Sequence, residues 1–122
     1  MVNLARGKIG EDASALLGAL LVTKIGLAGL SRADIPEKLR RDFYLYLDEF
    51  SQFATLSLAN MLSELRKYRI NLLASTQYLS AVPFQVRDAV MDNVGTIISF
   101  RLGLTDAELL AGEFYPSFRL TT

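Results

Sequence analysis

The sequence predicts an α/β fold with a mainly parallel sheet flanked by helices. Two apolar runs, Phe43–Leu47 and residues 70–75, lack the in-out alternation of a half-exposed strand, which is typical of strands covered on both faces. Segments with helical spacing of apolar residues separate these runs. Strands that alternate with helices form layered α/β structures. The 122 residues make one domain or part of one, with no internal domain boundary.

The first third of the chain predicts one long helix between two less regular segments. Residues 2–5 are interpreted as a short strand. Glu11 and Asp12 suit the positive end of a helix, and residues 13–30 after them are apolar nearly all round, so we expect a buried helix. Residues 31–42 are rich in charge and predict a solvated connector.

The remaining two thirds predict three helices and one further strand. Residues 56–68 are expected to be helical, because apolar side chains recur there at helical spacing. Residues 84–91 follow Pro83 and predict a short helix. Residues 96–100 predict a third core strand, and residues 106–114 a last helix capped by Thr105.

Composition excludes several classes of site. There are 13 basic and 13 acidic residues, so no overall charge attracts nucleic acid. The absence of Cys excludes disulfides and zinc-thiolate sites, and the absence of His excludes a Ser-His-Asp triad. Lys24 interrupts the most apolar segment before it is long enough to cross a bilayer, and no signal-peptide pattern begins the chain. We therefore expect a cytoplasmic location with no membrane segment in this chain.

Two adjacent carboxylates, Asp48 and Glu49, end the strand Phe43–Leu47. Desolvating a carboxylate is costly, so the pair is expected where the strand reaches solvent or a bound cation. In a Walker B element the first acid helps to hold Mg²⁺ and the second polarises the water that attacks a γ-phosphate. The alternative is a solvated strand end without a ligand.

Polar residues also follow the other two predicted strands. Thr76 and Gln77 come after residues 70–75, and Arg101 comes after residues 96–100. Ligands of open α/β sheets bind at this carboxyl edge. A neutral amide both donates and accepts, so Gln77 is suited to sense a γ-phosphate or align a water; alternatively it only starts a loop. For Arg101 two interpretations have equal weight, a phosphate contact and an ion pair with Glu49 or Asp106.

Arg66 begins a basic run, residues 66–69, that closes the helix predicted at 56–68. Cations at this position complement the helix dipole, which is a purely structural role. The functional alternative is an arginine finger, a guanidinium presented to the nucleotide of a neighbouring subunit.

Several segments in this order resemble one protein family. Together they resemble the C-terminal half of the ATPase core of the TraG/TraD-type conjugative coupling proteins, and the wider HerA/FtsK group of DNA-pumping hexamers is similar. The segments are Val2-Asn3-Leu4-Ala5-Arg6-Gly7, Leu45-Tyr46-Leu47-Asp48-Glu49-Phe50, Leu62-Ser63-Glu64-Leu65-Arg66-Lys67-Tyr68, Leu72-Leu73-Ala74-Ser75-Thr76-Gln77, Asn93-Val94-Gly95-Thr96-Ile97-Ile98-Ser99-Phe100-Arg101 and Asp106-Ala107-Glu108.

The resemblance implies a fold and a set of roles. The fold would be a partial RecA-like P-loop NTPase core, with 1–122 as a single partial domain, the C-terminal half of that core. Asp48 would be the Mg²⁺-linked Walker B acid, Glu49 the catalytic carboxylate, Gln77 the sensor glutamine and Arg66 the trans-acting arginine. Thr76 and Arg101 are assigned with Asp48 to nucleotide binding.

The resemblance also implies partners. In the family, ATP hydrolysis around a hexameric ring drives DNA through a central pore, and the motor works with relaxosome and secretion-channel proteins of type IV secretion. Full-length family members are anchored at the inner membrane and face the cytoplasm.

The sequence departs from the family because it has no P-loop. The motif requires Gly, four residues, and then Gly-Lys-Ser/Thr, whereas Gly7-Lys8 is followed by Ile9. ATP and Mg²⁺ are therefore expected only with a Walker A half, and the isolated chain is expected to be inactive. In the family the P-loop strand lies between the strand that ends at Gln77 and the strand 96–100. Its absence predicts a slot that closes or promotes self-association.

Two readings from other functional classes remain open. The chain is alternatively a non-catalytic α/β interaction domain or an inactive truncated fragment, with its acids facing solvent. A receiver-like phospho-acceptor domain would also place acids at a strand end, but no second acidic cluster follows the first strand.

Overall fold

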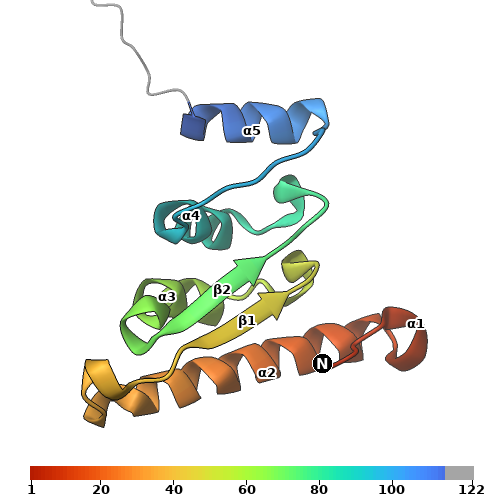
Figure 1. Cartoon of the computed structure of the whole chain (residues 1–122). Coiled ribbons are helices and arrows are strands. Elements are labelled where there is room, and N and C mark those ends of the chain that lie inside the picture. Colours follow the sequence, from red (N-terminus) through yellow and green to blue (C-terminus); the bar gives the residue numbers. More distant parts are fainter. Residues whose placement is uncertain (115–122) are drawn as a thin grey trace, which may run out of the picture.

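The computed structural model describes residues 1–114 and shows a mixed α/β protein that is mostly helical. A two-stranded parallel sheet is flanked by helices, and the longest helix runs along the whole molecule (Figure 1). The helices and strands are α1 (Arg6–Ile9), α2 (Glu11–Leu30), β1 (Phe43–Leu47), α3 (Leu56–Leu65), β2 (Ile70–Ala74), α4 (Phe84–Asn93) and α5 (Leu104–Phe114). Short 3₁₀ turns join them: η1 (Ser31–Asp34), η2 (Glu37–Leu39), η3 (Phe50–Phe53), η4 (Arg66–Tyr68) and η5 (Leu79–Ala81).

The α/β class and the parallel pairing are confirmed. β1 pairs with β2 in the register that sets Phe43 opposite Ile70 and Leu47 opposite Ala74. Both strands point toward the end of the molecule where α2 begins (Figure 1). Their carboxyl ends therefore lie side by side, as a parallel sheet requires.

The expectation that both strands are covered on two faces is wrong. Leu47 and Ile70 are buried on one face. On the other, Tyr44 is 60% exposed, Tyr46 67% and Leu73 57%. Within residues 1–114 no helix covers this second face, so the unbroken apolar pattern of the strands leaves aromatic and aliphatic side chains in solvent.

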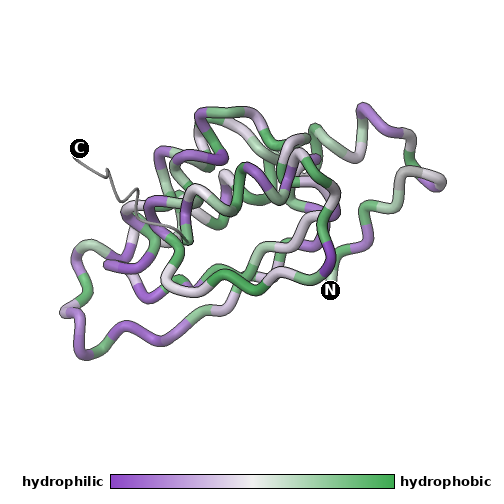
Figure 2. The backbone as a smooth tube through the Cα atoms, turned by 90° about the horizontal axis from the view of Figure 1, so that it is seen from above, coloured by the Kyte–Doolittle hydropathy of each residue, from purple (hydrophilic) through white to green (hydrophobic). Residues whose placement is uncertain are grey.

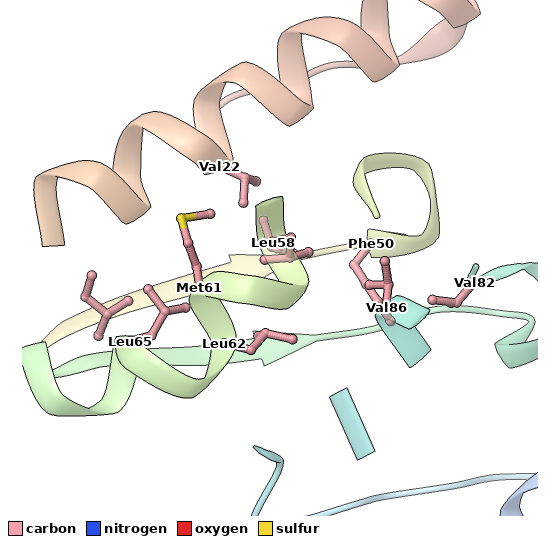
Figure 3. Packing of buried hydrophobic residues seen from close by; sticks show 10 residues of the cluster. Val22, Phe50, Leu58, Met61, Leu62, Leu65, Val82 and Val86 are labelled. Atoms are coloured by element: carbon pink, nitrogen blue, oxygen red, sulfur yellow. The ribbon is translucent and has the colours of Figure 1, made fainter. Parts of the chain in front are cut away.

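The core lies between α3, the covered face of the sheet, and parts of α2 and α4 (Figure 3). α3 begins as its sequence predicts, because the Thr55 side chain accepts a hydrogen bond from the backbone N–H of Leu58 at 3.2 Å. The buried hydrophobic cluster comprises Val22, Leu47, Phe50, Leu58, Met61, Leu62, Leu65, Ile70, Val82 and Val86.

The helix predicted at 13–30 is present as α2, but its expected burial is wrong. Its buried positions are mostly small: Ser14, Gly18, Val22, Gly26 and Gly29. Its leucines instead point away from the core; Leu16 is 62% exposed and Leu20 54%. A seam of small residues lets the α2 backbone approach its neighbours closely, and a Cβ built on Gly18 would lie only 2.0 Å from Cδ1 of Phe53.

The prediction that Lys24 leaves this segment too short to cross a membrane is wrong, because the stretch Glu11–Asp34 meets the criteria of length and composition for a span. A core helix of a soluble protein and a signal sequence meet the same two criteria, so they do not assign α2 to a bilayer. The expectation that this chain has no membrane segment stays a prediction.

Two predicted strands are wrong. Residues 1–5 are irregular and lead into α1, and the Ser14 hydroxyl donates a hydrogen bond to the carbonyl of Leu4. Residues 96–100 are irregular as well, with Ile98 80% and Phe100 89% exposed. In the described part of the chain the sheet has only two strands, so 96–100 has no adjacent strand with which to form a ladder.

Thr105 is not a cap, because α5 already begins at Leu104 and includes it. The helices predicted at 56–68 and 84–91 are present, as α3 followed by the turn η4 and as α4.

The connector between α2 and β1 is exposed, as expected, but two arginines tie it down. Nη1 of Arg40 donates to the carbonyl of Lys67 at 2.6 Å, and its guanidinium lies 5.1 Å from the ring centre of Tyr68. Nη1 of Arg32 donates to the carbonyl of Tyr68 at 3.1 Å. The hydrophilic connector forms the end of the molecule where α2 stops (Figure 2).

The seam of small residues can be tested with Gly18→Ala. Alanine improves helix propensity by up to about 1 kcal/mol, but its Cβ would overlap the Phe53 ring, and overpacking costs about 1–3 kcal/mol. We expect the free energy of unfolding, measured by urea titration, to fall by about 1–2 kcal/mol. Gly112→Ala in α5 is the control, because no atom lies within 4 Å of its Cβ position, and it should not destabilise. Equal effects of the two changes would contradict the seam.

Candidate functional site

Asp48 and Glu49 directly follow β1 and lie beside the carboxyl end of β2. The sheet ladder continues one residue beyond both strands. The backbone N–H of Ser75 donates to the carbonyl of Leu47 at 2.9 Å, and the N–H of Phe50 donates to the carbonyl of Ser75 at 2.9 Å. The two acids lie between these hydrogen bonds, so Ser75 fixes their place at the sheet edge.

The Asp48 carboxylate is exposed and held by one of its two oxygens. Oδ1 accepts a hydrogen bond of 2.7 Å from the hydroxyl of Ser75. Within residues 1–114, Oδ2 accepts no hydrogen bond. One oxygen therefore orients the side chain and the other is free for a ligand.

Glu49 is held more firmly and in a less common backbone conformation. Its φ and ψ are both 52°, in the left-handed region that non-glycine residues seldom adopt. Oε1 accepts from the hydroxyls of Ser51 and Thr76, each at 3.0 Å, and from the backbone N–H of Gln77 at 3.4 Å. No hydrogen bond to Oε2 occurs within the described chain. Backbone strain alone does not mark a site, since Arg69 is also left-handed, at the turn that follows η4.

An open hollow of about 660 Å³ gathers these residues at the carboxyl end of the sheet. Asp48, Glu49, Thr76 and Gln77 all line it, together with Ser51, Gln52, Ser75, Tyr78 and Ala81. The structure thus brings four of the six predicted site residues together on one rim. Its size falls in the range of small-molecule pockets.

Arg101 lies outside this hollow. It lines a neighbouring hollow that shares Gln77 and Tyr78 with the first. The ion pair with Glu49 or Asp106, one of its two predicted alternatives, does not form in the described part of the chain.

Asp106 instead fastens α5 to the loop that follows Gln77. It is only 5% exposed, and its two carboxylate oxygens accept from the backbone N–H groups of Leu79 and Ser80, each at 2.9 Å. Burial would raise the pKa of Asp106, but the hydrogen bonds from Ser80 and Leu79, with the positive charge of Arg87, more than offset it and lower the pKa below its ordinary value. A residue that we predicted only as a possible partner of Arg101 thereby shapes the edge of the site.

Arg66 lies at the opposite end of the sheet, in η4 just before β2 begins. Its neighbours are engaged: Nζ of Lys67 lies 2.9 Å from Oε1 of Glu64, and Nη1 of Arg69 lies 3.6 Å from Oδ1 of Asp42. The Arg66 side chain is exposed and makes no hydrogen bond or ion pair within residues 1–114. It cannot reach the hollow of its own chain, so any contact with a nucleotide would have to be made in another subunit.

The hollow is lined by two carboxylates and otherwise by uncharged residues. Mg²⁺ is usually held by one or two carboxylates, with waters and substrate phosphates completing its shell. Oδ2 of Asp48, which accepts no hydrogen bond among the described residues, is the carboxylate oxygen available to such an ion. No group of three potential ligands occurs among the described residues, so the protein side chains shown here do not form a complete metal cage.

Two contributors escaped the sequence interpretation. The hydroxyls of Ser75 and Ser51 orient the two acids. The only sequence signal for them was their position, one residue past β2 and two residues past Glu49.

Comparison of this chain with protein-family models, curated proteins and solved structures found no match.

The link between Asp106 and the loop can be tested with Asp106→Asn. The amide removes the negative charge and sets an NH₂ group against backbone donors, so we expect the free energy of unfolding at pH 7 to fall by about 1–3 kcal/mol. Hydrogen exchange of the Leu79 and Ser80 amides should accelerate. Asp92→Asn is the matched control, since Asp92 is exposed in the same half of the chain.

The same pair of proteins should differ less in acid. The pKa of Asp106 is lower in the folded than in the unfolded chain, so its contribution is fully present above the unfolded value of about 3.9 and is lost as the pH falls through the folded value. A difference between wild type and Asp106→Asn that stays constant from pH 7 to pH 2 would refute this role.

Proposed function

We propose that this chain is the C-terminal half of a RecA-like ATPase core, part of the ATP-driven DNA-translocating motor of conjugation and type IV secretion. The family assignment depends on the sequence resemblance to the coupling proteins. The observation that supports it most is that Asp48, Glu49, Thr76 and Gln77 line one hollow at the carboxyl edge of parallel strands. Parallel pairing of β1 and β2 brings these strand ends together, and the family resemblance gives the residues found there their proposed roles.

The division of labour between the acids follows from their contacts. Asp48 is exposed and keeps one oxygen unengaged, which suits a carboxylate that helps to hold Mg²⁺. Glu49 is half-buried and anchored through Oε1 by three donors. That anchoring restrains the carboxylate, and its other oxygen, Oε2, is proposed to orient a water and accept its proton. Bound ATP with Mg²⁺ would supply the phosphoryl group that this water attacks.

Gln77 connects the catalytic acid with the rest of the rim. Its backbone N–H is bonded to Glu49, and its side chain is exposed at the hollow. In the proposed enzyme the side-chain amide of Gln77 contacts the γ-phosphate. The loop that follows Gln77 is fastened to α5 by Asp106, so this contact would be coupled to α5. Thr76 holds Glu49 from the same loop, and Arg101, across Tyr78, is proposed as a further phosphate contact.

The distribution of charge supports head-to-tail assembly of copies. Residues 31–42 and 64–69 contain seven basic and four acidic residues, although the whole chain has 13 of each. Arg66 belongs to this basic end, whereas the two carboxylates lie at the opposite end of the sheet. A basic end that meets the two carboxylates of a neighbour would bring Arg66 toward the neighbour's hollow, as in the hexamer of the family.

The proposal requires a Walker A segment, which this sequence does not contain. DNA, relaxosome and secretion-channel proteins are the proposed partners of the complete motor, at the cytoplasmic face of the inner membrane. The second candidate is a non-catalytic interaction domain. It is favoured by the uncovered sheet face of Tyr44, Tyr46 and Leu73, because large exposed apolar patches mark interaction sites.

The catalytic role is tested in a protein that carries a Walker A segment upstream of this chain. We expect Glu49→Gln to lower the rate of ATP hydrolysis by about 10²–10⁴-fold, because general base catalysis contributes that much, while nucleotide binding persists. Glu64→Gln is the control, since its carboxylate only pairs with Lys67 on the surface. Undiminished hydrolysis by Glu49→Gln would assign the hollow to the interaction domain instead.

The role of Arg66 as an arginine finger is tested by mixing two inactive variants, each carrying a Walker A segment upstream of this chain. Arg66→Ala and Glu49→Gln should each lack activity, since a finger contributes about 10³–10⁵-fold. Mixed in one ring, they form interfaces in which an intact Arg66 meets an intact Glu49, so part of the activity should return. Arg41→Ala, which removes another exposed arginine of the basic end, should remain active alone. If mixing restores nothing although the proteins co-assemble, Arg66 does not act between subunits.

A further inference from the structure

The outward side of α2 is an apolar surface that the proposed function does not use. Leu16, Leu17, Leu20 and Leu27 are 62%, 44%, 54% and 57% exposed. They lie opposite the seam of small residues that packs on the core. An apolar row of this kind on a helix usually marks a contact with another molecule.

One row of residues on this surface is complementary in charge to the same row running in the opposite direction. Asp12, Leu16, Leu20 and Lys24 are spaced by four residues and so form a single i±4 ridge along the helix. All four are exposed, and neither Asp12 nor Lys24 forms an ion pair within residues 1–114. The ridge thus has an acid at one end, a base at the other and two leucines between them.

We infer that α2 is the docking surface for a second copy of this chain, which packs on it antiparallel about a two-fold axis near Gly18. In this register Leu16 lies opposite the partner's Leu20, and Asp12 opposite the partner's Lys24. Two-fold symmetry repeats both contacts, so one interface holds two leucine contacts and two ion pairs. The packing of i±4 ridges against each other is the commonest geometry between helices in globular proteins.

The same residues argue against a lipid surface as the occupant. Lys24 interrupts the leucines, and Glu11 and Asp12 would be repelled by anionic headgroups. The opposite face of α2 is engaged as well, because Phe53, Met61 and Ile70 occupy the space above Gly18, Gly26 and Gly29. Insertion of α2 into a bilayer would have to break this packing.

The pairing does not depend on the proposed ATPase, because it uses no residue of the hollow and does not use Arg66. A single pair of helices buries less than the roughly 800 Å² per partner of a stable complex. We therefore expect a reversible dimer with a dissociation constant in the micromolar range.

Charge reversal tests the register directly, by sedimentation equilibrium of the 122-residue chain over a range of concentrations. Lys24→Glu alone sets acid against acid, and Asp12→Lys alone sets base against base, so each should weaken self-association by at least about tenfold. A one-to-one mixture restores both ion pairs, and a heterodimer should form with near wild-type affinity. Lys38→Glu, which changes an exposed charge in η2 away from α2, should dimerise as wild type does.

Leu20→Glu tests the apolar part of the interface. It should abolish dimerisation while circular dichroism and the urea midpoint stay unchanged, because the side chain is 54% exposed in the single chain. A wild-type chain that remains monomeric at millimolar concentration would overturn the inference. So would a dimer that is indifferent to the charge reversals, or a monomer that floats with phosphatidylcholine–phosphatidylglycerol vesicles and loses this binding in Leu20→Glu.

Discussion

The parallel pairing of β1 with β2 is the constraint on which the rest of the structure depends. Parallel strands cannot be joined by a tight turn, and here the return from the end of β1 to the start of β2 is made by η3, α3 and η4. α3 then supplies Leu58, Met61, Leu62 and Leu65 to the core that covers the sheet. Without this pairing Asp48 and Glu49 would have no fixed relation to Ser75, Thr76 and Gln77, which lie 27 or 28 residues from their partners along the chain.

Elements that depend on local pattern could be predicted from the sequence. β1, β2, α3 and α4 each carry their own apolar spacing or cap, and their ends fall within a few residues of the prediction. The convergence of the acids with Gln77 was predictable for a related reason, since parallel strands place their carboxyl ends together. The exact hydrogen bonds of Glu49 were not, because its left-handed backbone and its approach to Thr76 depend on how the loop after β1 closes.

The wrong predictions concern segments whose structure depends on contacts with residues far away in the sequence. Residues 96–100 have the composition of a strand, but a strand exists only beside another one, and the described chain offers none there. In α2 the nearly uniform apolar composition gave no direction to the buried face. The better signal was the spacing of Gly18, Gly26 and Gly29, which marks the side on which Phe53, Met61 and Ile70 approach. Asp106 was misjudged because its hydrogen bonds join segments 26 and 27 residues apart.

The hydrogen bonds of Arg40 have a mechanical consequence. One guanidinium binds carbonyls from two separate stretches, Ile35 in the connector and Lys67 in the turn that bears Arg66. Since the connector runs from the end of α2 to the start of β1, a push or pull on Arg66 is shared between a helix and a strand. Any displacement of η4 is therefore opposed by the connector as well as by β2.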